Sequence, residues 1–485
     1  MSVADISNLS LGHCKAEAEL EDLEKYFITT PAYIHARNEA RRKTYYIGQR
    51  GAGKTALFRK LADDYEKKGH YVILNISPDS FSYEKFNDAR HDYSDIRAVY
   101  GTVWHYTLVT QMFRAVVDFY DRRASIKSNR ENIEKLRSYL KSKNAFEDHG
   151  FLGTFLSFFG TFTSSSAFSV LQVGSTGSRN YKEFLRLTTL AEISGELNSF
   201  LNITDSYPIC VFIDELDRGW DNTPEATNFI HGLFYAVGEI KKLRNVNLFV
   251  SLRSDMYNDL SSILPDPEKM REEIERFSWN PKMLQGLIAE RIIANYPMSE
   301  NTAHQEALNT VFDDGVLDYV IEHSLQRPRE VIEFCTEALT EFSNRVYYDH
   351  GLNKVDLDII QSVEPAFSRG RLADIEKEYE HQYPGLHTFL SCFENAPTHY
   401  TMSEFKEKVE DAMLRSVEGL GGESWLATDF STSKLLEILF EIGFIKLYSL
   451  KDKRYLAYYE GSFLNIENVP KLRIHDVFTS ALKCH

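Results

Sequence analysis

Over residues 44–280, short apolar runs typical of strands alternate with longer segments in which apolar residues recur at helical spacing. Runs rich in β-branched and aromatic side chains predict strands at 44–47, 71–76, 209–213 and 246–254, with a short further strand near 276–279. Apolar residues at helical spacing predict helices at 56–62, 100–143, 181–203 and 224–243. The run at 209–213 has no polar interruption, which is typical of a parallel strand covered on both faces. The pattern therefore predicts an α/β core built on a parallel sheet.

The hydrophobic pattern typical of strands does not continue over residues 281–379. Small helices are predicted over 281–345, and a linker with a further helix over 346–379. Pro328 lies just inside one predicted helix start, where its missing N–H group costs little. These residues are therefore expected to form a helical lid beside the core.

The last hundred or so residues show a different order of elements. Two amphipathic helices are predicted around 405–414 and at 433–442, and Gly443 ends the second as a left-handed C-cap. Strands at 444–448 and 454–459 follow, joined by a polar turn. Helices followed by a β-hairpin predict a winged helix. The whole chain is thus expected to have four parts: an N-terminal helical lead-in (1–43), an α/β core (44–280) with an insertion at about 100–180, a helical lid and linker (281–379), and a winged-helix-like domain (380–485).

Composition narrows the class of protein. Of the 485 residues, 43% are apolar, the formal net charge is −16, and no apolar run reaches the roughly 18 residues of a membrane span. The five cysteines are scattered without metal-binding spacing, and the N-terminus lacks the features of a signal peptide, so a cytoplasmic protein with reduced thiols is expected. Residues 371–485 hold 13 Lys and Arg against 18 Asp and Glu. This balance favours a protein-interaction or regulatory role for the last domain over DNA binding, although it leaves room for a local basic groove.

The stretch from Gly48 to Thr55 fits the pattern G-x-x-x-x-G-K-[ST] of a phosphate-binding loop. A predicted strand precedes it and a predicted helix follows, so backbone N–H groups and the helix dipole point at one place, where a phosphate chain binds. Lys54 is expected at the β- and γ-phosphates and Thr55 at Mg²⁺. A chance glycine-rich turn is the alternative, and the flanking elements disfavour it. The residues predicted to contact the nucleotide here are Gly48, Gln49, Arg50, Gly51, Ala52, Gly53, Lys54, Thr55 and Ala56.

Two carboxylates follow the apolar strand at 209–213. Asp214 is expected at the carboxyl end of that strand, where open α/β sheets bind ligands, and is predicted to hold Mg²⁺ directly or through water. Glu215 is the candidate for polarising the attacking water. An ordinary strand leading into a solvated loop is the alternative. Ser251 and Arg253, at the end of the neighbouring strand, are predicted to sense the γ-phosphate, or else to be strand-end residues facing solvent.

Two arginines flank Pro328 at the start of a helix in the predicted lid. Arg329, and less strongly Arg327, is predicted to reach the γ-phosphate, because a guanidinium can fork onto phosphate oxygens. The alternative is a solvated pair, or one bonded to Glu330 or Glu333.

Residues 150–178 change character, with Gly, Ser, Thr and Phe dominating. A flexible insertion or a β-ribbon is predicted there. A membrane-touching or partner-binding patch is the alternative, but the segment lacks a basic flank.

The order of these parts resembles AAA+-related and STAND-type P-loop ATPases, with a general plan similar to that of the origin-recognition initiators. The sequences of 48–55 and 212–218 are more similar to those of bacterial P-loop ATPases of conflict systems, including KAP-like and Sll1717-type ATPases. The resemblance implies ATP and Mg²⁺ as cofactors, with Lys54, Thr55, Asp214 and Glu215 in the roles above and Arg329 as the lid sensor. It also implies nucleotide-driven assembly as a homo-oligomer, or activation of a separate effector protein, in several cases in anti-phage defence. Arg271 and Arg276 are candidate arginine fingers.

Three functions compete at this point. The first is an ATP-binding and hydrolysing switch whose nucleotide state controls assembly or partner activation. The second is a DNA-engaging ATPase, a loader or remodeler, that uses the winged helix. The third is a nucleotide-binding scaffold with negligible turnover. A GTPase is disfavoured, because no Asn-Lys-x-Asp segment appears where guanine would be read.

Overall fold

The structure is a computed structural model that describes most of the chain, in two compact units. The sheet unit consists of Pro31–Gly48 and Leu57–Arg276, and the helical unit of Met1–Thr30, Gln49–Ala56 and Phe277–His485. The described residues are 6–14, 23–77, 96–123, 128–143, 150–163, 193–217, 220, 223–261, 267–296, 298–349, 351–380, 382–420, 431–460, 464 and 466–485.

The sheet unit is built on five parallel strands in the order β2-β3-β4-β1-β5. This confirms the predicted α/β class with a parallel sheet. The last strand lies slightly earlier than the expected 276–279. The strands are β1 (Tyr45–Ile47), β2 (Val72–Ile76), β3 (Ile209–Ile213), β4 (Val246–Leu252) and β5 (Ile274–Arg276).

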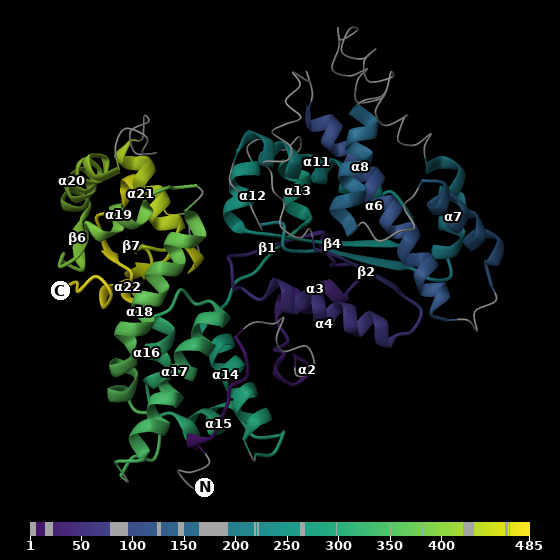
Figure 1. Cartoon of the computed structure of the whole chain (residues 1–485). Helices are drawn as coiled ribbons and strands as arrows, with labels where there is room; N and C mark the ends of the chain where they lie inside the picture. Colours follow the sequence, from purple (N-terminus) through teal and green to yellow (C-terminus); the bar gives the residue numbers. More distant parts are fainter. Residues whose placement is uncertain are drawn as a thin grey trace. The chain divides into compact units, whose positions relative to one another are not determined.

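Helices cover both faces of this sheet (Figure 1). Helix α3 (Pro31–Arg37) and the part of α4 (Lys54–Lys67) that belongs to the sheet unit lie on one face. On the other face lie α6 (Ile96–Asp121), α8 (Gly150–Thr163) and α11 (Pro224–Ile240), and α7 (Arg130–Ser142) packs on α6. Short helices α12 (Ser254–Ser261) and α13 (Pro267–Glu272) follow β4.

An aromatic layer fastens α4 to the sheet. The rings of Phe212 and Phe249 stack with centroids 4.7 Å apart, and Phe58 of α4 packs on Phe212 at 5.5 Å and on Tyr46 at 5.4 Å. Aromatic pairs contribute about 0.5–1.5 kcal/mol each beyond their buried area. The helix that follows the predicted phosphate loop is therefore held firmly against β1, β3 and β4.

The expected flexible insertion or β-ribbon at 150–178 is wrong for the residues that are described, since 150–163 form helix α8. Phe155 and Phe159 are four residues apart and therefore share one face of the helix. Both are buried, against Trp104 at 5.6 Å and Tyr100 at 5.7 Å between ring centroids. Packing on α6 thus outweighs the weak helix propensity of a Gly- and Phe-rich sequence. Residues 164–178 lie outside the described part.

The helical unit begins with α2 (Leu23–Tyr26) and continues as a series of helices after the sheet. These are α14 (Pro281–Asn295), α15 (His304–Val311), α16 (Val316–Glu322), α17 (Pro328–Val346) and α18 (Leu357–Tyr379). Proline opens both α14 and α17, as was predicted for Pro328. Asn280 caps α14 by accepting a hydrogen bond from the Met283 N–H at 2.9 Å.

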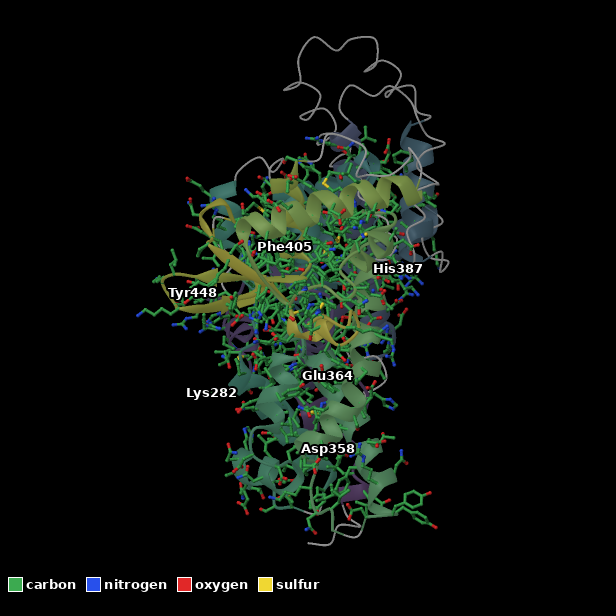
Figure 2. All side chains as sticks on the ribbon, turned by 90° about the vertical axis from the view of Figure 1, so that its left-hand side faces the viewer. Lys282, Asp358, Glu364, His387, Phe405 and Tyr448 are labelled. Carbon is green, nitrogen blue, oxygen red and sulfur yellow. The ribbon has the colours of Figure 1, made fainter. Side chains whose placement is uncertain are left out.

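The C-terminal segment 386–485, also in the helical unit, combines helices with a small antiparallel sheet of order β6-β9-β7-β8. Its strands are β6 (His399–Thr401), β7 (Ile445–Ser449), β8 (Arg454–Leu456) and β9 (Lys471–Ile474), and its helices are α19 (Leu386–Ser391), α20 (Met402–Leu420), α21 (Thr432–Glu441) and α22 (Asp476–Thr479). The predicted helices and the hairpin β7–β8 are confirmed, whereas β6 and β9 were not predicted. Figure 2 shows Tyr448 on the projecting part of this sheet.

Gly443 has φ +85° directly after α21, as predicted for a left-handed C-cap. The assignment of this segment as a winged helix, and the four-part division of the chain, stay predictions. None of the helices in the described ranges has both the length and the apolar character to cross a membrane.

Candidate functional site

The carboxyl ends of β1, β4 and β3 form one edge of the sheet unit. Gly48, the first residue of the predicted phosphate loop, donates its N–H to the Leu252 carbonyl at 3.2 Å. Asp214 directly follows β3, in which Ile213 pairs with Val250, and its N–H donates to the Ile76 carbonyl at 2.9 Å. Because only β4 separates β1 from β3, the ends of β1 and β3 lie roughly 10 Å apart. Gly48 and Asp214 thus share the edge where parallel sheets bind ligands.

Glu215 has an unusual backbone at this edge. Its φ is +60°, a left-handed conformation that costs a non-glycine residue about 1–3 kcal/mol and is concentrated at functional sites. Its N–H donates to Asp214 Oδ1 at 2.9 Å, and its carboxylate accepts a hydrogen bond from Ser77 Oγ. Ser77 was not predicted as a site residue. The only sequence signal for it is its place directly after a predicted strand.

The two polar residues predicted at the end of β4 have different surroundings. Ser251 is buried within the strand, beside Tyr46 of β1 in the register. Arg253 follows the strand and forks onto Asp255, with Nε to Oδ1 at 3.0 Å and Nη2 to Oδ2 at 2.5 Å. The bidentate pair holds the guanidinium close to the end of β4. Phosphate sensing by Ser251 and Arg253 stays a prediction.

The predicted phosphate loop joins β1 to α4, and its residues 49–56 belong to the helical unit. Two of its glycines have positive φ, +78° at Gly51 and +91° at Gly53, which only glycine adopts without strain. Lys54 Nζ donates to the Gln49 carbonyl at 3.0 Å across the loop. Thr55 and Ala56 lie in the first turn of α4, and Arg50 is exposed.

Trp279 packs on the loop from the segment just before α14. Its indole Nε1 donates to the Ala52 carbonyl at 2.8 Å, and its ring lies 3.8 Å from where a Cβ at Gly53 would be. The side chain is half-buried. Sequence reasoning missed this contact, because nothing in the local pattern connects Trp279 with a loop more than two hundred residues earlier.

The start of α17 lies against the same loop. A Cβ added at Gly51 would lie 3.4 Å from Arg329 Cβ and 3.8 Å from Arg327 Cβ. Arg327 Nε also donates to Gln49 Oε1 at 3.3 Å. The structure therefore brings the two predicted lid arginines beside the predicted phosphate loop, within one unit.

Arg327 is the centre of a buried ion-pair network. It is 7% exposed, and its Nη1 donates to Glu378 Oε2 of α18 at 2.9 Å. Glu330 lies 3.6 Å away and accepts a hydrogen bond from the Leu325 N–H at 2.7 Å. Burial by itself lowers the pKa of Arg327, but the charges of Glu378 and Glu330 more than reverse this and raise it. Burial raises the pKa of Glu330, and Arg327 partly opposes that rise.

Two donor atoms of these arginines have no hydrogen-bond partner among the described residues. They are Arg327 Nη2 and Arg329 Nε, both buried. A buried donor without a partner is costly, so such an atom can accept a new partner at low cost. The two atoms belong to side chains that flank the Gly51 turn.

Comparison with known proteins finds one family model that matches part of the chain and one relative of low sequence identity. Residues 282–376 match the family model of the FunZ-associated C-terminal helical domain, which corresponds to α14–α17 and most of α18. The putative transposon gamma-delta 80.3 kDa protein of Escherichia coli (strain K12) is 23% identical over 482 residues, covering 96% of this chain. The chain spans 66% of the length of that relative.

Two solved structures show a weak overall similarity. One is Cdc6p from Pyrobaculum aerophilum, with a TM-score of 0.30, 13% identity, and coverage of 100% of this chain and 98% of that one. The other is the Aeropyrum pernix ORC2 protein in ADPNP and ADP complexes, with a TM-score of 0.29, 10% identity, and coverage of 93% and 89%. The parallel strand order β2-β3-β4-β1-β5 and the phosphate-loop sequence of residues 48–55 characterise the core of this chain.

Proposed function

We propose that the protein is an ATP-binding and hydrolysing switch. One observation carries this proposal: the loop with the phosphate-binding sequence starts at the same sheet edge that carries Asp214 and Glu215. A nucleotide-binding scaffold needs only the loop. The strained backbone of Glu215, held by Ser77, supports hydrolysis in addition to binding, because such strain is maintained where a side chain must be aimed.

The donor set suits magnesium. Mg²⁺ prefers hard oxygen ligands and is usually held by one or two carboxylates with phosphate oxygens and water. Thr55 supplies a hydroxyl and Asp214 a carboxylate, and no group of three or more metal-ligating side chains occurs among the described residues. When bound, the ion neutralises charge on the phosphates. Thr55 and Asp214 are the residues that we propose hold it.

The remaining roles follow from chemistry. Lys54 contributes an ammonium group to the β- and γ-phosphates, and the loop N–H groups hold the phosphate chain. Glu215 orients and polarises the attacking water. Arg329, whose Nε has no hydrogen-bond partner among the described residues, contributes positive charge at the γ-phosphate. Ser251 and Arg253 respond to the γ-phosphate from the end of β4.

The output of the switch is proposed to be assembly into a homo-oligomer or activation of a separate effector protein, including a role in anti-phage defence. The C-terminal segment is the proposed output surface. Its net acidic balance suits a protein partner better than a nucleic acid.

Binding of Mg²⁺ and ATP is expected to change the fluorescence of Trp279, since its indole hydrogen-bonds to Ala52 in the proposed phosphate-binding loop. Titration of the full chain with a non-hydrolysable ATP analogue measures the Kd, and release of phosphate from ATP measures turnover. Trp279→Phe is the control, which should remove the signal while calorimetry still detects binding. A wild-type chain that binds neither ATP nor ADP would contradict the proposal.

A DNA-engaging ATPase is the second candidate, and two observations favour it. The relative cited above bears the word transposon in its description. In addition, basic side chains lie over aromatic rings on the C-terminal sheet, with Lys471 Nζ 4.2 Å from the Tyr448 ring centroid and the Arg473 guanidinium 5.3 Å from that of Tyr455 (Figure 2 labels Tyr448).

The effect of duplex DNA on the rate of ATP hydrolysis distinguishes the switch from the DNA-engaging ATPase. For the switch, we expect ATP turnover to be unchanged by DNA. For a DNA-engaging enzyme, DNA should stimulate turnover, and log Kd should rise steeply with log salt concentration, with a slope of about 0.9 per phosphate contacted. Lys471→Glu should then weaken the stimulation without changing the basal rate. Stimulation that is unchanged by this substitution would exclude the surface around Lys471 as the DNA-binding surface.

A further inference from the structure

We propose that Arg327 is a positioning residue that couples the phosphate loop to the C-terminal segment through the turn Ser324–Arg327. The inference rests on the proposed function, because it assigns a consequence to nucleotide binding at that loop. We call residues 324–327 the coupling turn. All the contacts that carry the proposal lie within the helical unit.

One end of the coupling turn touches the loop. Arg327 Nε donates to Gln49 Oε1 at 3.3 Å, and the Arg327 side chain lies within 3.9 Å of the position of a Cβ at Gly51. Gln49 also offers its backbone carbonyl to Lys54 at 3.0 Å. A phosphate that draws Lys54 away from that carbonyl therefore changes the residue on which Arg327 rests. Arg327 Nη2 is buried and has no hydrogen-bond partner among the described residues.

The same guanidinium is fixed on its other side to α18. Its Nη1 donates to Glu378 Oε2 at 2.9 Å, and the Glu378 side chain is only 3% exposed. Helix α18 ends at Tyr379, just before the C-terminal segment. A buried guanidinium forked between two acceptors cannot leave one without moving the other, because water does not compensate the lost bond there. A displacement at Gln49 is thus passed to the end of α18.

The other end of the coupling turn contacts the C-terminal segment. The Tyr459 hydroxyl donates to the Ser324 carbonyl at 3.4 Å and lies 2.8 Å from His475 Nε2. His475 is fully buried, and its Nδ1 accepts from the Val477 N–H at 3.2 Å, which leaves the proton on Nε2 to bond Tyr459. Leu325 Cδ2 lies 3.0 Å from where a Cβ at Gly443 would be. The turn is therefore in direct contact with the start of the β7–β8 hairpin region.

The backbone between these two ends is constrained. Gln326 has φ +51°, a conformation that a non-glycine residue keeps only when its surroundings impose it. Those surroundings are the Ser324 hydroxyl, which accepts the Gln326 N–H at 3.2 Å, and Glu330, which accepts the Leu325 N–H at 2.7 Å. The proposal requires a second arrangement of this turn, in which Gln326 leaves the left-handed region when Arg327 moves.

The test compares two buried arginines in the full chain. Arg327→Lys keeps a positive charge for Glu378 but cannot fork onto Gln49 as well. Arg371→Lys is the matched control, because Arg371 is 8% exposed and pairs with Glu333 and Asp374 at 2.9 Å. Hydrogen exchange of peptides in 443–485 is measured with and without a non-hydrolysable ATP analogue, and the Trp279 signal gives the Kd.

In the wild type, the analogue is expected to alter exchange in 443–485. Arg327→Lys should reduce this change at least about fivefold, the lower end of typical coupling, while the Kd changes by less than that factor. Arg371→Lys should leave the change intact. Tyr459→Phe removes the hydrogen bond from Tyr459 to the Ser324 carbonyl, at the other end of the coupling turn, and should give the same result as Arg327→Lys. If Arg327→Lys lowers the melting temperature more than Arg371→Lys does, the result with Tyr459→Phe decides the test.

Failure of this inference is distinct from failure of the ATPase proposal. A wild type that binds no analogue contradicts the proposed function. Normal binding with no change in 443–485, or equal losses in Arg327→Lys and Arg371→Lys, overturns the coupling role while leaving the ATPase intact. Loss of binding itself in Arg327→Lys would place Arg327 in direct contact with nucleotide and overturn its assignment as a positioning residue.

Discussion

Lys54→Ala is expected to weaken the binding of Mg²⁺ and ATP by roughly 10- to 150-fold, since a hydrogen bond to a charged group is worth about 1.5–3 kcal/mol. The ammonium group lies at the start of α4 and donates to the Gln49 carbonyl at 3.0 Å. We expect it to exchange that carbonyl for phosphate oxygens when the nucleotide binds. Calorimetry with a non-hydrolysable analogue, at one salt concentration, measures the change in Kd.

Lys60→Ala is the matched control for this substitution. Lys60 lies on the same helix and is 13% exposed, but its ammonium group pairs with Asp64 of that helix at 2.9 Å. Removing it should leave the Kd unchanged, because Lys60 lies outside residues 48–56, and should lower stability, because Asp64 loses a charged partner. Equal Kd values for Lys54→Ala and the wild type would show that residues 48–55 are a glycine-rich turn with no phosphate function.

The parts of the site that the sequence predicts are those defined by local order. A strand, a glycine-rich loop and a helix start are consecutive in the chain, so the turn at Gly51 and Gly53 follows from residue types alone, and both adopt positive φ. Asp214 at a strand end is equally local. Parallel strands of the same sheet end at the same edge, which is why Gly48 and Asp214 share one.

The parts that the sequence does not predict depend on pairings between distant residues. Trp279 meets Ala52, Ser77 meets Glu215, and Arg327 meets Glu378, and no spacing rule joins the members of these pairs. Helix α8 was missed for a related reason. Its Gly- and Phe-rich sequence has poor helix propensity, and it becomes helical because α6 offers an aromatic surface to Phe155 and Phe159.

The two arginines at α17 show how such pairings separate residues that look equivalent in the sequence. Arg327 donates to Gln49 and Glu378 and lies 3.6 Å from Glu330, which ties it to α18. Each arginine also has one buried nitrogen without a partner among the described residues, and both lie beside Gly51. We propose Arg329 for contact with phosphate and Arg327 for relaying that contact.

Glu215→Gln is expected to lower the rate of ATP hydrolysis by about 10²–10⁴-fold, the usual contribution of a positioned general base. Glutamine has nearly the same shape, and its side-chain oxygen can still accept the hydrogen bond from Ser77, so the strained turn at φ +60° is retained. Affinity for ATP should stay close to that of the wild type. Phosphate release measures the rate, and mass measurement with ATP detects accumulation of any assembled state.

Glu275→Gln supplies the control, because Glu275 is a carboxylate in another strand of the same sheet. Glu275 lies in β5, is 13% exposed and is engaged by His35 at 3.0 Å, so its neutralisation should leave turnover unchanged. If Glu215→Gln hydrolyses ATP as fast as the wild type, Glu215 does not act on the water, and a scaffold with slow, uncatalysed turnover becomes the better account. If turnover falls and ATP-dependent assembly or partner binding persists, nucleotide binding sets the active state and hydrolysis ends it, because the substitution removes only the second step.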